Sequence, residues 1–233
     1  MRKALIGAVA ALALAACSQQ AEAPAEEAGP PTPVATEAPA GTYAIEPHHA
    51  SVVVKLSHLG LSNYTARFNS VDGALTIDPA DPTSAQIFAT VDPASLDTYF
   101  RGDYRGTHPG SPYSSFEQAI TRGAEWLNVG SFPQATFAST SITLTGENTA
   151  DVVGDLTIRG VTHPITLHAT FNHGYAAHPF VPDGPAMIGF SAEGVFKRSD
   201  YGMTMMVNPD GPGIGDDVTL QIEAEFVRED QAG

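Results

Sequence analysis

The feature that most constrains this chain is a series of short segments in which apolar and polar residues alternate. Side chains of a β-strand point to opposite faces in turn, so alternation predicts strands with one buried face. Such rows occupy 52–58, 85–91, 135–137, 156–158, 165–171, 188–196 and 218–226. Turn sequences rich in Pro, Gly, Asp and Asn separate them, as at 78–82 and 208–213. No strand–helix unit repeats, which disfavours a parallel sheet.

The number of rows predicts an all-β fold of about eight antiparallel strands, spanning residues 42–230. Closure into a barrel would leave no free sheet edges. One region, 114–127, has the pattern of a helix: Phe116 and Ile120 would lie on one apolar face. Gly123 lowers the helical propensity of this region. We therefore expect an eight-stranded antiparallel barrel with a short helical insertion.

The first 16 residues have the pattern of an export signal. Arg2 and Lys3 precede an apolar run, 4–16, that is shorter than the roughly 20 residues of a membrane span. The run ends in LAAC, residues 14–17, which resembles the lipobox of bacterial lipoproteins. That resemblance implies cleavage before Cys17 and lipidation of Cys17; an ordinary secretory signal is the alternative. Residues 17–41, rich in Ala, Pro and Glu, predict a disordered tether.

The charge of the chain limits its partners. With 11 basic and 26 acidic residues the net charge is −15 at pH 7, which repels phosphate backbones and argues against nucleic-acid binding. We expect membrane attachment through lipid on Cys17 instead. Ser18 favours sorting to the outer rather than the inner membrane of a bacterial envelope, with the barrel facing the periplasm. Cys17 is the single cysteine, so no intramolecular disulfide forms.

Motifs for catalysis or metal binding are lacking in the sequence. There is no GxSxG elbow and no HExxH pair, and one cysteine cannot build a thiolate zinc site. The eight histidines do not follow metal-site spacing, so we expect no metal site, no cofactor and no catalytic residue. Met203, Met205 and Met206 are expected to be adaptable packing at a cavity rim.

The inward rows leave the state of the barrel interior open. They mix large apolar residues with small ones, namely Ala85, Ala89, Ala135, Ala169, Ala192, Gly194 and Ala224. Interdigitation in a packed core and space for an apolar guest explain this mixture equally well. His58 continues the inward row of Val52, Val54 and Leu56. It could contact a ligand head group, serve as a structural histidine, or act in catalysis or metal binding.

Several segments share an order and spacing along 42–228. They are YAIEPHH at 43–49, HLGLS at 58–62, PASLDT at 93–98, WLNVGSFP at 126–133, ATFAST at 135–140, VGDLTIRGVTHP at 153–164, RSDYG at 198–202 and IGDDV at 214–218. Together they resemble the YceI-like family of bacterial exported proteins. The resemblance implies a lipocalin-like barrel that holds a long polyisoprenoid, such as an isoprenoid quinone or a polyprenyl phosphate. Residues 99–124 are longer than the family pattern, which could reshape the cavity mouth.

On this basis we expect non-catalytic binding, transport or sequestration of an isoprenoid lipid. The expected ligand-binding residues are Val52, Val54, Leu56, Phe137, Leu167, Phe171, Phe190, Phe196 and Leu220, with His58 as the polar one. One alternative is an enzyme that acts on a small hydrophobic substrate through His58 or Asp200. Another is an interaction scaffold with a packed core, in which a homodimer could form.

Overall fold

The computed structural model describes residues 29, 31–208 and 211–229. The predicted signal segment 1–16 and the predicted lipidation site Cys17 lie outside these residues. Every described helix and strand belongs to one compact unit, Pro31–Gly233. None of the described helices is long and apolar enough to cross a membrane.

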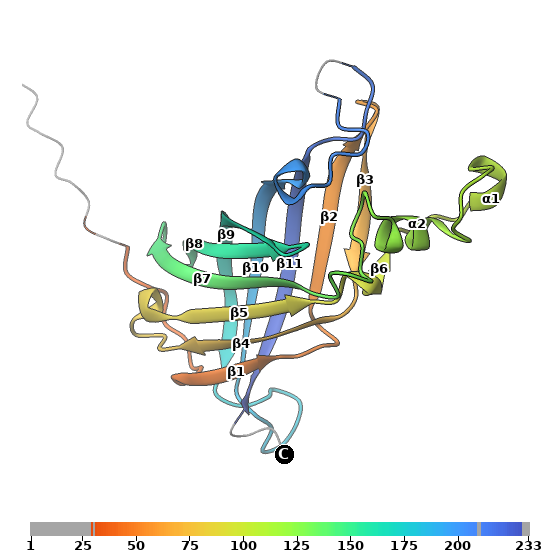
Figure 1. The fold of residues 1–233 in the computed structure, drawn as a ribbon. Coiled ribbons are helices and arrows are strands. Elements are labelled where there is room, and N and C mark those ends of the chain that lie inside the picture. Colours follow the sequence, from red (N-terminus) through yellow and green to blue (C-terminus); the bar gives the residue numbers. More distant parts are fainter. Residues whose placement is uncertain (1–28, 30, 209–210, 230–233) are drawn as a thin grey trace, which may run out of the picture. The chain divides into compact units, whose positions relative to one another are not determined.

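Eight strands close into an antiparallel barrel (Figure 1). In order around the barrel they are β1 (Gly41–Ile45), β4 (Val71–Ile77), β5 (Gln86–Val91), β7 (Ala135–Leu144), β8 (Thr149–Ile158), β9 (Val161–Tyr175), β10 (Met187–Lys197) and β11 (Asp217–Arg228). Pairing of β1 with β11, with Tyr43 opposite Arg228, closes the ring. The eight-stranded antiparallel barrel predicted from the alternating rows is confirmed.

Three more strands extend the sheet beyond the ring: β2 (Ser51–His58), β3 (Ser62–Phe68) and β6 (Leu96–Asp97). Strand β2 pairs with the first half of β11, Val54 opposite Leu220, so β1 and β2 together follow one edge of β11 with a break at 46–50. In Figure 1, β1, β4, β5 and β7 run across the direction of β2, β10 and β11. The chain therefore changes direction between β1 and β2, at 46–50.

Residues 31–40 pack against the barrel. The Val34 N–H donates to the Glu147 carbonyl at 2.8 Å, and Ala38 is only 4% exposed. Gly174 makes room for this segment, because a Cβ there would lie 2.5 Å from Thr36 Oγ1 and 2.7 Å from the Ala38 Cβ. The disordered tether predicted for 17–41 therefore does not extend through these residues.

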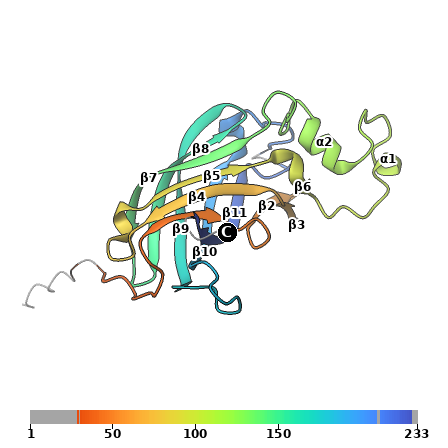
Figure 2. The same ribbon diagram turned by 90° about the horizontal axis from the view of Figure 1, so that it is seen from below.

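The insertion between β6 and β7 carries two short helices, α1 (Tyr104–Thr107) and α2 (Phe116–Arg122). The helix predicted over 114–127 is shorter in the structure, because it ends at the C-cap Gly123, and α1 was not predicted. Strand-to-strand turns hold the 3-10 helices η1 (Pro82–Ser84), η2 (Pro93–Ser95) and η3 (Arg198–Tyr201). In Figures 1 and 2 the insertion and residues 31–40 lie at opposite sides of the barrel.

Candidate ligand-binding cavity

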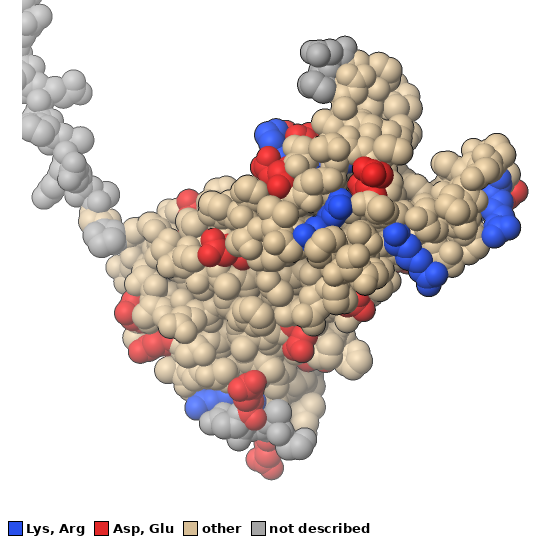
Figure 3. Space-filling view, in the orientation of Figure 1, with Lys and Arg blue, Asp and Glu red and all other residues tan. Residues whose placement is uncertain are grey.

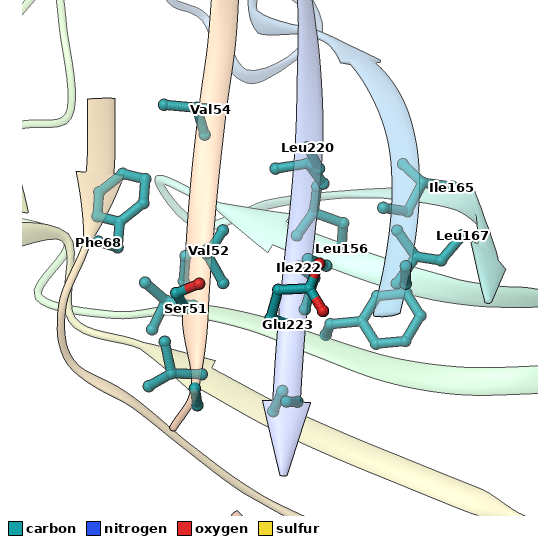
Figure 4. A pocket seen from close by; sticks show the side chains of 18 of the residues that line it. Ser51, Val52, Val54, Phe68, Leu156, Ile165, Leu167, Leu220, Ile222 and Glu223 are labelled. Atoms are coloured by element: carbon teal, nitrogen blue, oxygen red, sulfur yellow. The ribbon is translucent and has the colours of Figure 1, made fainter. Parts of the chain in front are cut away.

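The inward rows of the strands surround a cavity of about 690 Å³. This volume is within the range of pockets that hold small organic ligands, about 300–1,000 Å³. Figure 4 shows aliphatic side chains of β2, β8, β9 and β11 directed at this space, among them Val52, Leu156, Leu167 and Ile222. The barrel interior therefore encloses space that its own side chains do not fill.

The ten residues predicted from the sequence all lie on the cavity wall: Val52, Val54, Leu56, His58, Phe137, Leu167, Phe171, Phe190, Phe196 and Leu220. They come together because period-two alternation in a closed antiparallel sheet sends every second residue inward. Their contact with a ligand stays a prediction.

Part of the cavity wall consists of small side chains on adjacent strands. Ala150, Ala169 and Ala192 are direct cross-strand partners on β8, β9 and β10, and all three line the cavity. Of the seven small inward residues noted in the sequence, only Gly194 does not line it. A Cβ on Gly194 would lie 2.7 Å from Leu167 Cδ2, so the leucine side chain already occupies that space.

One end of the cavity is bounded by the N-terminal segment and the β7–β8 turn. Pro33, Val34 and Thr36 line it there, together with Glu147 and Asn148. Val34 is 42% exposed while it lines the cavity, so this end is covered by a thin layer of chain.

The other end is walled by aromatic side chains, one from β3 and three from the insertion. Tyr64, Phe100, His108 and Phe116 line the cavity. The Phe116 ring lies 5.4 Å from that of Phe100 and 5.7 Å, edge-on, from that of Tyr64. Sequence reasoning missed these four residues, although the aromatic content of 99–116 was a usable signal for the three in the insertion. The insertion therefore forms part of this end of the cavity, and its reshaping of the mouth relative to other members of the family stays a prediction.

A partly buried hydrogen-bond network holds the aromatic wall on β3 and β6. The Tyr64 hydroxyl donates to the Thr98 carbonyl at 2.6 Å, and the Thr98 hydroxyl donates to the Glu117 carboxylate. Burial raises the pKa of Glu117, but hydrogen bonds from Thr98, Ser115 and the backbone outweigh burial, so the net pKa is lowered. Glu117 is therefore a carboxylate that fixes the insertion.

Arg198 is a buried guanidinium on the cavity wall, 2% exposed. It donates hydrogen bonds of 2.7–3.0 Å to the carbonyls of Met203, Met205, Ile214 and Gly215. Its guanidinium also lies 5.2 Å from the centre of the Trp126 ring. Burial lowers the pKa of Arg198. These hydrogen bonds hold the β10–β11 connection in place. Nothing in the sequence indicated this structural role of Arg198.

The two residues proposed for the enzyme alternative lie in different places. His58 lines the cavity at the exposed end of β2, and its imidazole makes no hydrogen bond to the described residues. Asp200 lines a separate, shallow groove on the outer face of β9 and β10, with His163 and Tyr201. The structure therefore does not assemble a catalytic pair from His58 and Asp200. Within the described ranges, no three His, Cys, Asp or Glu side chains are grouped to hold a metal ion.

Comparisons with known proteins agree with this architecture. The family model described as the YceI-like domain matches residues 43–226. A UPF0312 protein of Pseudomonas putida (strain W619) is 36% identical over 198 residues, 84% of this chain and 91% of that protein.

Two solved structures share the fold. BcnA of Burkholderia cenocepacia has a TM-score of 0.61 at 21% identity, covering 78% of this chain and 98% of that one. A polyisoprenoid-binding domain from Saccharophagus degradans, implicated in plant cell wall breakdown, has a TM-score of 0.55 at 14% identity, covering 80% and 98%.

Proposed function

Since this chain belongs to the YceI-like domain family, we propose that its cavity binds a long isoprenoid lipid, which the protein transports or sequesters without converting it. The observation that carries the proposal is the apolar cavity of about 690 Å³ inside the barrel. The Saccharophagus domain of similar fold, described as polyisoprenoid-binding, supports the ligand class.

Burial of the isoprenoid tail provides enough free energy for binding. At roughly 0.8 kcal/mol per methylene, each buried five-carbon unit contributes about 4 kcal/mol. Four units would supply about 16 kcal/mol against an association cost of about 4–15 kcal/mol. Micromolar affinity requires about 8 kcal/mol. Four buried units reach this value when the association cost lies in the lower part of that range, and a fifth unit, which adds about 4 kcal/mol, reaches it with a mid-range cost.

The charges on the cavity wall favour an uncharged head group. Among the described lining residues Arg198 is the one permanent cation, and it already donates to four carbonyls. Glu147 and Glu223 also belong to the lining and would repel a phosphate. We therefore favour a quinone-type head over a polyprenyl phosphate, with His58 and the aromatic wall as its surroundings.

The proposed location rests on the sequence. A lipid on Cys17 would hold the barrel at a bacterial envelope membrane, facing the periplasm, and Ser18 favours the outer membrane.

Organic extraction of the purified protein, followed by mass spectrometry, tests the ligand class. We expect an isoprenoid lipid in the extract. Protein stripped of lipid is then offered two probes with the same tail, one ending in a quinone and one in a phosphate, and should retain the quinone more tightly. Protein that yields no isoprenoid and retains neither probe would refute the proposal.

A further inference from the structure

Two loops meet at the end of the cavity where His58 lies, and backbone hydrogen bonds join them. The Leu59 N–H donates to the Gly213 carbonyl at 2.8 Å, and the Gly215 N–H donates to the Ser57 carbonyl at 2.7 Å. A β-bridge between His58 and Ile214 lies between these bonds. We call the joined residues, 58–62 with 203–208 and 211–214, the mouth tip. The mouth tip is thus a single joined structure.

The mouth tip exposes large apolar side chains. Leu61 is 83% exposed, and Leu59, Met205 and Met206 are 38%, 45% and 53% exposed. The Ile214 N–H donates to the Met206 carbonyl at 2.8 Å, which holds the methionine segment beside the strand bearing His58. Apolar residues that gather on one projection, rather than singly over the surface, are typical of an interaction site.

Charge is scarce on the same projection. The described residues of the mouth tip include no Asp, Glu, Lys or Arg, in a chain of net charge −15. Asp210 belongs to the loop but lies outside the described residues. Figure 3 shows the visible face of this projection without charged side chains. The insertion at the same end of the cavity carries exposed Arg101, Arg105 and Arg122 beside exposed Asp103 and Glu125, so its charges of opposite sign nearly balance. The mouth tip itself therefore presents no fixed charge from its described residues that a lipid surface would repel.

The mouth tip is continuous with the cavity. His58, Met206 and Ile214 line the cavity, and both His58 and Met206 are exposed as well. A lipid that leaves a bilayer beneath the tip would meet apolar cavity wall without crossing water. An apolar surface beside the entrance of a lipid-binding cavity is suited to contact a bilayer, because the bilayer is the source of the lipid.

We propose that the mouth tip inserts into the surface of a phospholipid bilayer and loads the cavity from it. This inference rests on the proposed function for its purpose, but the docking itself can be measured without the ligand.

The test uses the full chain with Cys17→Ser, so that no lipid anchor contributes. Phosphatidylcholine vesicles, with and without an isoprenoid quinone, are used for flotation and for measuring the rate of quinone uptake. The double variant Leu61→Ser, Met205→Ser should lower both the vesicle-bound fraction and the uptake rate by a factor of at least ~10, since each change removes several methylene groups that the bilayer would bury. Quinone retention from detergent micelles, which needs no bilayer, should be unchanged.

The matched control is Phe180→Ser. Phe180 is 90% exposed, more than Leu59, Leu61, Met205 or Met206, but it lies in the β9–β10 connection and does not line the cavity. It should leave flotation and uptake unchanged. Equal losses in the control and the tip variant would mean non-specific adhesion, and no loss in the tip variant would mean no docking. Either result overturns the proposal.

Two further outcomes are informative. A concentration-dependent dimer in solution that the tip variant abolishes would assign the tip to a second copy of the chain and overturn docking. If wild type takes no quinone from micelles but still floats with vesicles through the tip, the proposed ligand is wrong while the docking proposal stands.

Discussion

Replacing Ala192 by Phe separates a ligand cavity from a packed core. Ala192 lies opposite Ala169 on one side and Ile222 on the other, and all three line the cavity. The added ring would project into the empty space of about 690 Å³. Overpacking, which costs about 1–3 kcal/mol in a filled core, should therefore not occur. We expect the free energy of unfolding to stay within about 1 kcal/mol of wild type.

The same ring should reduce ligand binding strongly. A benzyl group occupies about the space of one five-carbon isoprene unit, and at roughly 0.8 kcal/mol per methylene the excluded unit costs about 4 kcal/mol. This free energy corresponds to roughly a thousandfold weaker Kd. A ligand that shifts along the cavity would recover part of this loss.

Trp126 provides the assay, because it is the single tryptophan and lines the cavity. Titration with a quinone-tipped isoprenoid should quench its fluorescence, and urea unfolding of the same samples gives stability. Val195→Phe is the control, since Val195 is on the same strand, points outward and is 55% exposed. The reasoning fails if Ala192→Phe lowers stability by several kcal/mol while the affinity for the isoprenoid is unchanged.

Four other substitutions test separate parts of the structure. His58→Ala should weaken isoprenoid binding by roughly 1–2 kcal/mol in the same titration if the imidazole bonds the head group; unchanged affinity would leave His58 without that role. Arg198→Lys should lower the free energy of urea unfolding by about 2–4 kcal/mol, because one ammonium cannot reach four carbonyls. The pKa of Glu117 is lowered in the fold from an ordinary value of 4.5, so its carboxylate stabilises the protein above about pH 4.5 and less as pH falls. Thermal melts should therefore show Glu117→Gln destabilised at pH 7 and closest to wild type at low pH; a gap independent of pH would contradict this. Cys17→Ser should release the protein from the membrane fraction of its host, and a wild-type protein that is already soluble and unmodified at Cys17 would refute the anchor.

The sequence predicted what depends on local alternation. The barrel and its lining from Val52 to Leu220 follow from period two, which needs only neighbouring residues. Ala38 and Arg198 could not be predicted in this way, because their burial depends on distant partners. Ala38 fits only because Gly174 lacks a Cβ, and Arg198 is held by carbonyls of a loop that follows it.

The insertion is an intermediate case. Gly123 suggested where the helix would weaken, and α2 does end there. The packing of Phe100 and Phe116 against Tyr64 joins three segments, so no single stretch contains the information for the aromatic wall.

Closure of the barrel has a consequence for how the chain folds. Strands β1 and β2 are made first during synthesis, yet both pair with β11, which is made last. Contacts between residues so far apart in sequence slow folding, because the entropy of closing the loop is lost before the contacts form. Until β11 arrives, the edges of β1 and β2 that it will cover are unpaired and prone to association. We therefore expect a slow final folding step, accelerated by variants that stabilise the β2–β11 pairing, and a nascent chain that depends on chaperones until its last strand is complete.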